Sequence, residues 1–200
     1  MIVTVLNALF LSLTAYLLGS LPFGVWVGRL FIGRDIRAGG SGHSGATNTL
    51  RQAGWLAGVL VMILDMAKGW AAMWLAVQFG VSPLTQILAG AAVVAGHCWP
   101  LFAGFRGGMG LATGGGALLA VYPLGLALGL GLVILALLVL RHSARGSVVA
   151  GLLIGPTIWV FTRSTQLTLI GLAIGVVIAA RFFSDWKRVY RELWLDREKG

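Results

Sequence analysis

The chain has 200 residues, of which 58% are hydrophobic and only 10% are charged, and its mean hydropathy is +0.91. Soluble domains carry about 25% charged residues, so this composition excludes an ordinary soluble domain. The apolar residues form long runs, such as Leu60–Leu64 and Leu111–Leu140. Because one crossing of a bilayer needs about 20 apolar residues, we predict an all-α polytopic membrane protein. The length leaves room for six or seven crossings within a single domain, residues 1–200.

The distribution of the net charge of +9 and the single cysteine exclude several further kinds of site and partner. One cysteine, Cys98, excludes a disulfide framework, and the histidines at positions 43, 97 and 142 lack metal-ligand spacing. We therefore expect no metal and no organic cofactor. The cations follow the predicted membrane topology and do not form one patch, so we expect no nucleic-acid partner. The sequence leaves the oligomeric state open.

The first half of the chain is predicted to cross the membrane three times. No basic segment precedes Ile2–Leu18 and no small-residue cleavage site follows it, so we interpret this run as a retained helix and not a signal peptide. A polar, glycine-rich segment, Gly28–Arg51, leads to crossings at about Gly54–Phe79 and Thr85–Pro100. A second glycine-rich segment, Gly104–Gly116, follows them.

The apolar run 111–140 is too long for one straight crossing, because 30 helical residues extend about 45 Å and the bilayer core measures about 30 Å. Pro123 follows Tyr122 near its middle and removes a helical hydrogen bond, so we predict two short crossings. After the polar stretch Arg141–Ser147 come Val148–Phe161 and Gln166–Ala180, either two short crossings or a hairpin that enters the membrane partway.

The distribution of basic residues predicts the orientation. With the N-terminus outside and seven crossings, 13 of the 15 lysines and arginines lie on the cytoplasmic side, as the positive-inside rule requires. The C-terminus is then cytoplasmic. Within the basic tail 184–200, apolar residues occur at helical spacing between cations, which is typical of a helix lying at the membrane interface; they are Trp186, Val189, Tyr190, Leu193 and Trp194.

The first glycine-rich segment has the composition of an anion site. Residues 39–51 read Gly-Gly-Ser-Gly-His-Ser-Gly-Ala-Thr-Asn-Thr-Leu-Arg. Small residues leave backbone N–H groups accessible at a helix start, and an arginine can grip a phosphate through two hydrogen bonds. An equally good interpretation is a flexible loop capped by Thr47 or Asn48.

The second glycine-rich segment places Gly107, Gly108 and Gly110 around Arg106 before a predicted helix, as in an oxyanion-binding nest. It is not a P-loop, because no Gly-Lys-Ser/Thr follows at the required spacing. His97, at the preceding helix end, is a candidate proton carrier, although a structural hydrogen bond is the more common use of such a histidine.

Asp65 and Lys68 are charged residues inside an otherwise apolar predicted helix. Charges within a membrane are expensive and usually face a partner or a cavity. At i,i+3 spacing these two can pair with each other. We expect a structural pair or a pair bordering the site, in preference to a proton relay.

Four segments together resemble the PlsY family, the bacterial membrane acyl-phosphate:glycerol-3-phosphate acyltransferases. They are Ser-Leu-Pro-Phe-Gly at 20–24, the glycine-rich motif at 40–54, Leu-Asp-Met-Ala-Lys-Gly at 64–69 and the segment 96–113. The resemblance covers nearly the whole chain in order. It implies seven helices in the bacterial inner membrane, with cytoplasmic loops that build one active site.

The resemblance also implies the reaction. A fatty acyl group moves from acyl phosphate to the 1-hydroxyl of glycerol 3-phosphate and gives lysophosphatidic acid, the first step of phospholipid synthesis. Neither acyl-CoA nor acyl carrier protein is the donor. The sequence agrees, since no His-x4-Asp pair of other glycerol-phosphate acyltransferases is present: the residues five positions after the three histidines are Asn48, Phe102 and Ser147.

Site residues follow from the same resemblance. Acyl phosphate is already activated, so no covalent nucleophile is needed, and positioning alone can contribute about 7–11 kcal/mol. The candidate catalytic residues are Ser41, Arg51 and His97. The candidate substrate-binding residues are Ser41, His43, Thr47, Asn48, Arg51, Arg106, Gly107, Gly108, Gly110, Ser143, Ser147 and Asp185.

Four positions depart from the family pattern. His43 and Asp185 stand where the family has Asn, Met109 replaces a lysine, and Phe182 replaces a histidine. Losing the lysine removes a charge-assisted contact of about 1.5–3 kcal/mol. Asp185 would repel a phosphate unless it pairs with a neighbouring cation, Lys187 or Arg188. Three interpretations therefore stay open: a working acyltransferase, a divergent relative that is inactive or uses another acceptor, and a small membrane transporter.

Overall fold

The computed structural model describes residues 1–188, and all regular elements in this part of the chain are helical. The predicted interfacial helix of the tail lies largely in 189–200, outside the described residues. The elements are α1 (Ile2–Gly19), α2 (Phe23–Ile32), η1 (Ile36–Ala38), α3 (Ala46–Ala53), α4 (Trp55–Phe79), α5 (Pro83–Cys98), η2 (Leu101–Ala103), α6 (Leu111–Val121), α7 (Pro123–Leu140), α8 (Ser143–Thr162) and α9 (Thr165–Phe183).

Six helical stretches are long and apolar enough to cross a membrane among the described residues. They are Ile2–Ile32, which contains α1 and α2, Pro83–Ala103, which contains α5 and η2, and the helices α4, α7, α8 and α9. The remaining apolar helix, α6, has 11 residues and extends about 16 Å, roughly half of a bilayer core. The all-helical membrane architecture is confirmed, while the count of seven crossings and the orientation stay predictions.

The predicted break at Tyr122–Pro123 is confirmed, because α6 ends at Val121 and α7 begins at Pro123. The last two helices are longer than predicted, with 20 residues in α8 and 19 in α9. The predicted loop 141–147 largely belongs to α8: His142 is its N-cap and accepts a hydrogen bond from the Arg145 amide. Both helices are therefore long enough to cross fully, which the hairpin interpretation did not expect.

The helices pack through glycines that let two backbones touch. A Cβ on Gly116 of α6 would overlap the carbonyl of Met66 in α4, and a Cβ on Gly175 of α9 would overlap that of Gly151 in α8. Such small-residue contacts are typical of helix association in membranes, where no hydrophobic effect holds the helices together. These backbone contacts set the spacing between α4 and α6 and between α8 and α9.

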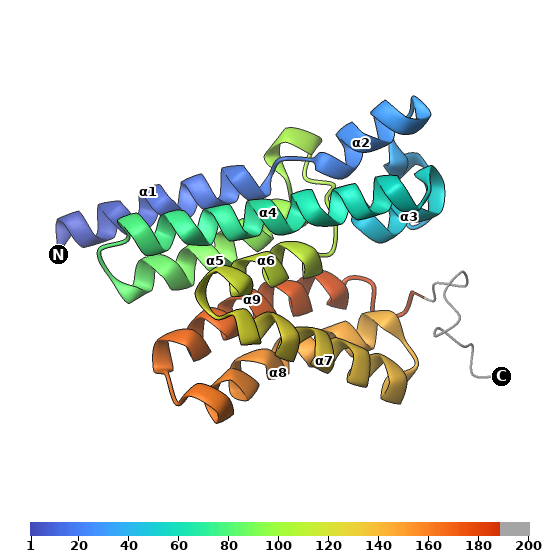
Figure 1. The fold of residues 1–200 in the computed structure, drawn as a ribbon. Coiled ribbons are helices and arrows are strands. Elements are labelled where there is room, and N and C mark those ends of the chain that lie inside the picture. The colour runs from blue at the N-terminus through green and yellow to red at the C-terminus, as the bar shows by residue number, and fades with distance from the viewer. Residues whose placement is uncertain (189–200) are drawn as a thin grey trace.

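The polar, glycine-rich segments lie toward one end of the bundle. In Figure 1 the loop before α3, the α7–α8 turn and the end of α9 lie at the right-hand end. The link between α5 and α6 lies nearer the middle of the view, and Arg37 bonds to it from the segment before α3. The N-terminus and the α4–α5 and α8–α9 turns lie at the opposite end. Segments far apart in the sequence are thus neighbours in space, which is the arrangement that a shared site requires.

Candidate active site

Three segments at this end of the bundle build the candidate site, and we name them by their residues. The first glycine loop is 39–45, which leads into α3. The second glycine loop is 104–110, which leads into α6. The C-terminal segment is 184–188, which follows α9.

Asn48 holds the first glycine loop in shape. Its side chain is 2% exposed and its amide group donates to the carbonyls of Ile36 (3.0 Å), Gly39 (3.3 Å) and His43 (2.8 Å). Its oxygen accepts from the Ser41 amide at 3.0 Å. The N-cap of α3 is Gly45, without a side-chain cap, so the predicted cap by Thr47 or Asn48 is wrong. The first glycine loop is held instead by the side chain of Asn48, a residue within α3.

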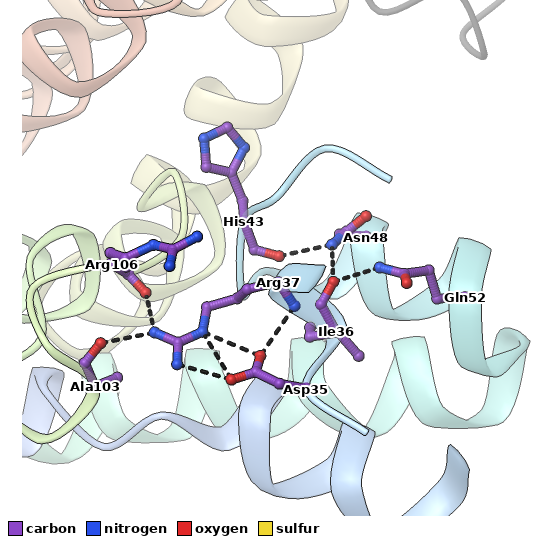
Figure 2. A network of polar contacts seen from close by, with 8 residues as sticks. All are labelled: Asp35, Ile36, Arg37, His43, Asn48, Gln52, Ala103 and Arg106. Carbon is purple, nitrogen blue, oxygen red and sulfur yellow. Dashed lines mark hydrogen bonds and ion pairs between the residues drawn. The ribbon is translucent and has the colours of Figure 1, made fainter. Parts of the chain in front are cut away.

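Arg37 joins the first glycine loop to the second (Figure 2). Its guanidinium pairs with the Asp35 carboxylate at 2.8 Å and donates to the carbonyls of Ala103 (2.6 Å) and Arg106 (2.9 Å). The hydrogen bond from Arg37 holds the pKa of Asp35 below its ordinary value, so the carboxylate stays charged. A longer contact runs from the Ser44 amide to the carbonyl of Gly107 at 3.4 Å.

The second glycine loop rests on His97. The Gly108 amide donates to the His97 carbonyl at 3.1 Å, and a Cβ on Gly108 would overlap the His97 imidazole. The predicted nest therefore cannot use the Gly108 amide, which already has a partner, and must rely on other amides of the loop. Gly107, Gly108 and Gly110 are buried, whereas Arg106 is exposed.

A buried charge cluster lies beneath this loop. Asp65 accepts a hydrogen bond from Lys68 at 2.8 Å, and His97 Nδ1 lies 3.5 Å from the same carboxylate oxygen. Lys68 also donates to the carbonyl of Leu21 at 3.0 Å. All three charged or polar side chains are at most 5% exposed. The predicted Asp65–Lys68 pair is confirmed, and it also fixes the histidine that supports the second glycine loop.

The end of α9 contributes a cation to the same place. Arg181 donates from Nε to the Gly108 carbonyl at 3.1 Å and from Nη1 to Ser184 at 2.8 Å. The sequence analysis counted Arg181 only as one of the cytoplasmic cations, so this role was missed. Among the described residues the start of α8 is also close, because the Arg145 guanidinium lies 5.6 Å from the ring of Trp186.

The C-terminal segment meets the first glycine loop. Asp185 lies 3.5 Å from His43 Nε2 and 3.7 Å from Arg188 Nη1, and Arg188 donates to the Ser41 carbonyl at 2.8 Å. The expectation that Asp185 pairs with a neighbouring cation is confirmed. Burial and the charge of Arg181 lower the pKa of His43 to about 4, against the opposing effect of Asp185. The imidazole is therefore neutral at pH 7 and does not form an ion pair with Asp185 there.

The other predicted site residues differ in exposure. Thr47 is exposed, and Ser41 and Arg51 are half-buried, with Arg51 in the last turn of α3. Ser143 is half-buried in the first turn of α8, and Ser147, one turn later, is 2% exposed. Ser41 belongs to the first glycine loop and Arg106 to the second, and the two loops are bonded through the Ser44 amide and the Gly107 carbonyl.

Two of the departures from the family pattern contribute to the apolar core. Phe182 is 6% exposed, and Met109 is half-buried and packs against the same cluster. These side chains replace polar family residues by packing contacts. Sequence reasoning also missed Gln52, which donates to the carbonyls of Ile36 and Gly39. The signal was available for Arg37, since Asp-Ile-Arg at 35–37 places two opposite charges beside the glycine motif.

The assembled end of the molecule suits anions. Its cations come from three parts of the chain, as Arg51, Arg106, Arg181 and Arg188, and its described acids, Asp35 and Asp185, are engaged by neighbouring arginines. Guanidinium groups and glycine-loop amides are groups that bind phosphate. Among residues 1–188 no group of three or more His, Cys, Asp or Glu is placed to hold a metal ion.

Comparison with known sequences places this geometry in a family. The profile of the family described as "Glycerol-3-phosphate acyltransferase" matches residues 9–192. A relative of that name from Geobacillus kaustophilus (strain HTA426) is 41% identical over 177 residues, which are 88% of this chain and 89% of the relative. Another, from Enterococcus faecalis (strain ATCC 700802 / V583), is 49% identical over 113 residues, 56% of this chain and about half of the relative (52%).

Two solved structures described as PlsY (YgiH), an integral membrane glycerol 3-phosphate acyltransferase, share the fold. The glycerol 3-phosphate form aligns with a TM-score of 0.79 and 34% identity, covering 96% of both chains. The form with lysophosphatidic acid aligns with a TM-score of 0.76 and 31% identity, covering 96% of this chain and 95% of the other. The chain therefore belongs to the glycerol-3-phosphate acyltransferase family and is an integral membrane acyltransferase.

Proposed function

We propose that the protein transfers a fatty acyl group from acyl phosphate to the 1-hydroxyl of glycerol 3-phosphate, giving lysophosphatidic acid and inorganic phosphate. The observation that carries this proposal is the junction of the two glycine loops through Arg37. It sets two anion-binding segments side by side. The solved relatives are described in glycerol 3-phosphate and lysophosphatidic acid forms, which name the acceptor and the product for those proteins.

The chemistry needs positioning more than it needs a reactive side chain. The acceptor hydroxyl attacks the acyl carbonyl carbon, the bond between that carbon and the phosphate oxygen breaks, and the departing phosphate takes the hydroxyl proton. Both substrates carry a phosphate, so the protein must hold two anions at a set distance. Well-oriented reactants can gain about 7–11 kcal/mol in this way.

The residue roles belong to this proposal. Ser41, Thr47 and Arg51 bind one phosphate from the first glycine loop and α3. Arg106 and the amides of the second glycine loop bind the other. His97 positions that loop from below, consistent with its contact to Gly108. The remaining proposed contacts to substrate come from His43, Ser143, Ser147 and Asp185. Asn48 was predicted to bind substrate, but its buried amide is used within the first glycine loop, so it acts by holding that loop.

The proposed setting is the bacterial inner membrane, with the site on the cytoplasmic face. Seven crossings with an external N-terminus put 13 of 15 cations on that face, in keeping with the positive-inside rule. The polar loops lie toward one end of the bundle, which agrees with this arrangement. The chain acts as one domain over 1–200.

A second candidate function is that of a divergent relative with another acceptor or no activity. Met109 and Phe182 favour it, because they place apolar packing where the family pattern has cations or polar groups. The triple variant Met109→Lys, Phe182→His, Asp185→Asn separates the two. If the wild type is inactive on glycerol 3-phosphate and the triple variant is active, the divergent function is supported.

The direct test is an assay of purified protein in detergent with palmitoyl phosphate and glycerol 3-phosphate, scored for lysophosphatidic acid. We expect turnover by the wild type and loss of turnover by Arg51→Ala. Arg34→Ala is the matched control, since Arg34 is an exposed arginine outside the glycine loops. Palmitoyl-CoA in place of palmitoyl phosphate tests the donor. A folded wild type without turnover on the first pair would overturn the proposal.

A further inference from the structure

Arg37 makes an unusual set of contacts for a residue outside the glycine loops. Its side chain is only 15% exposed. One side of the guanidinium is paired with Asp35 through hydrogen bonds of 2.8 to 3.2 Å. Nη1 points to the segment 103–106 and donates to the carbonyls of Ala103 and Arg106, 66 and 69 residues away in sequence.

The two carbonyls that Arg37 binds flank a strained turn. Between Ala103 and Arg106 lie Gly104 with φ +62° and Phe105 with φ +58°. A non-glycine residue with positive φ is uncommon and costs about 1–3 kcal/mol unless its surroundings hold it. Arg37 binds the residue before this left-handed pair and the residue after it. The arginine therefore fixes the shape of the turn and the direction in which Arg106 leaves it.

Hydrogen bonds also attach the backbone beside Arg37 to helix α3. Arg37 lies in the turn 36–38, whose Ile36 carbonyl accepts hydrogen bonds from Asn48 and Gln52 of α3. These residues share the short helix α3 with Arg51. A continuous series of polar contacts thus runs from the helix that carries Arg51 to the loop that carries Arg106. The residues proposed to hold the two phosphates are connected through one guanidinium.

We propose that Arg37 is a positioning residue that sets the separation between the two phosphate sites, and with it the alignment of acyl donor and acceptor hydroxyl. This inference rests on the proposed function. Arg37 need not touch either substrate, because its described side-chain bonds go to Asp35, to Ala103 at the end of η2 and to Arg106 in the second glycine loop. Lysine cannot replace it: an ammonium on a flexible chain lacks the rigid planar fork that binds a carboxylate and two carbonyls at once.

The kinetic consequence separates this role from substrate binding. Without Arg37 each loop still has its own phosphate-binding groups, so the KM for each substrate stays within about threefold. The distance between the sites is no longer held, and a displacement near 1 Å can cost about 100-fold in rate. We expect kcat of Arg37→Lys and Arg37→Ala to fall about 30- to 100-fold. A residue needed only for folding would lower the yield of folded protein and leave kcat per folded enzyme unchanged.

The experiment compares the wild type, Arg37→Lys, Arg37→Ala and the control Arg34→Lys as purified, monodisperse full-length proteins. It measures kcat and both KM values with palmitoyl phosphate and glycerol 3-phosphate. Hydrogen exchange of the amides in 101–110 is recorded without substrate. We expect at least tenfold faster exchange there in both Arg37 variants, and wild-type exchange and kinetics in Arg34→Lys.

Each outcome decides the inference. A fall in kcat with steady KM values and faster exchange in 101–110 supports it. Wild-type kcat in Arg37→Lys would overturn it, because charge alone would suffice. A rise in one KM with unchanged kcat would also overturn it, by making Arg37 a binding residue for one substrate. If the wild type gives no lysophosphatidic acid, the proposed function fails, and unchanged exchange in the Arg37 variants then refutes the connection independently.

Discussion

Replacing Asn48 should disorder the first glycine loop, and the expected size of the effect follows from its hydrogen bonds. The two amide hydrogens are shared among three carbonyls, and the side-chain oxygen accepts from the Ser41 amide. Each net hydrogen bond is worth about 1 kcal/mol, so Asn48→Ala removes about 3 kcal/mol that holds this loop. Since every 1.4 kcal/mol is tenfold, the productive loop conformation falls up to about 100-fold.

Asn48→Asp gives a sharper test of the same contacts. It keeps the acceptor for Ser41 but turns the donor into a second acceptor that faces the carbonyls of Ile36 and His43. Because the site is buried, an unpaired carboxylate there is costly. We therefore expect Asn48→Asp to lose at least as much activity as Asn48→Ala, although it is the closer isostere.

The matched control is Asn7→Ala. Asn7 in α1 makes a comparable set of bonds at the opposite end of the bundle: its amide donates to Phe79, and its oxygen accepts from Val81 and Thr85. Its loss should lower the melting temperature and leave kcat/KM of the folded fraction unchanged. Activity is measured as lysophosphatidic acid formation, and stability by thermal unfolding in detergent. Wild-type activity and stability in Asn48→Asp would refute the reasoning, because the amide would then not donate to those carbonyls.

Three further changes test the remaining parts of the site. Because His43 has a pKa near 4 in the folded protein and about 6.5 when unfolded, the unfolded state binds more protons between these values. The melting temperature should therefore fall as pH drops from 6.5 to 4, and His43→Gln should flatten that profile; identical profiles would contradict the assignment. Gly108→Ala should cut kcat about 10- to 100-fold, since its Cβ would overlap His97 and move the loop by about 1 Å; full activity would refute this. Asp65→Asn should destabilise the protein by about 3–5 kcal/mol because it leaves a buried ammonium unpaired, and adding Lys68→Met should recover most of the melting temperature.

The helical architecture could be predicted because apolar length and proline position act locally. The break at Tyr122–Pro123 follows from one missing hydrogen-bond donor and is present in the structure. The start of α8 was harder to predict, since Ser143, Arg145 and Ser147 read as a polar loop. In the fold these polar residues occupy the first turns of a helix, where its unpaired amide groups face the polar end of the bundle.

The candidate site was predicted as a set of segments, whereas the contacts between them were not. Motif spacing identified the two glycine loops, but it does not indicate that Arg37 contacts Ala103, 66 residues later in the sequence. Arg37 and Arg181 bind backbone carbonyls, and a carbonyl has no sequence signature. His43 and Asp185 were identified as separate departures from the family pattern, and their proximity depends on the tertiary fold.

The short helix α6 has a structural cause that bears on the donor. The second glycine loop folds back into the bundle, so that a Cβ on Gly110 would meet the side chains of Val94, Cys98 and Ile178. Val94 lies one turn before Cys98, the last residue of α5, and α6 therefore starts beside the last turn of α5. This start accounts for part of the short length of α6, which has 11 residues. The depth also suits the proposed donor: an acyl phosphate keeps its chain in the bilayer, so a phosphate-binding loop that dips into the bundle can meet the headgroup while the chain stays in lipid.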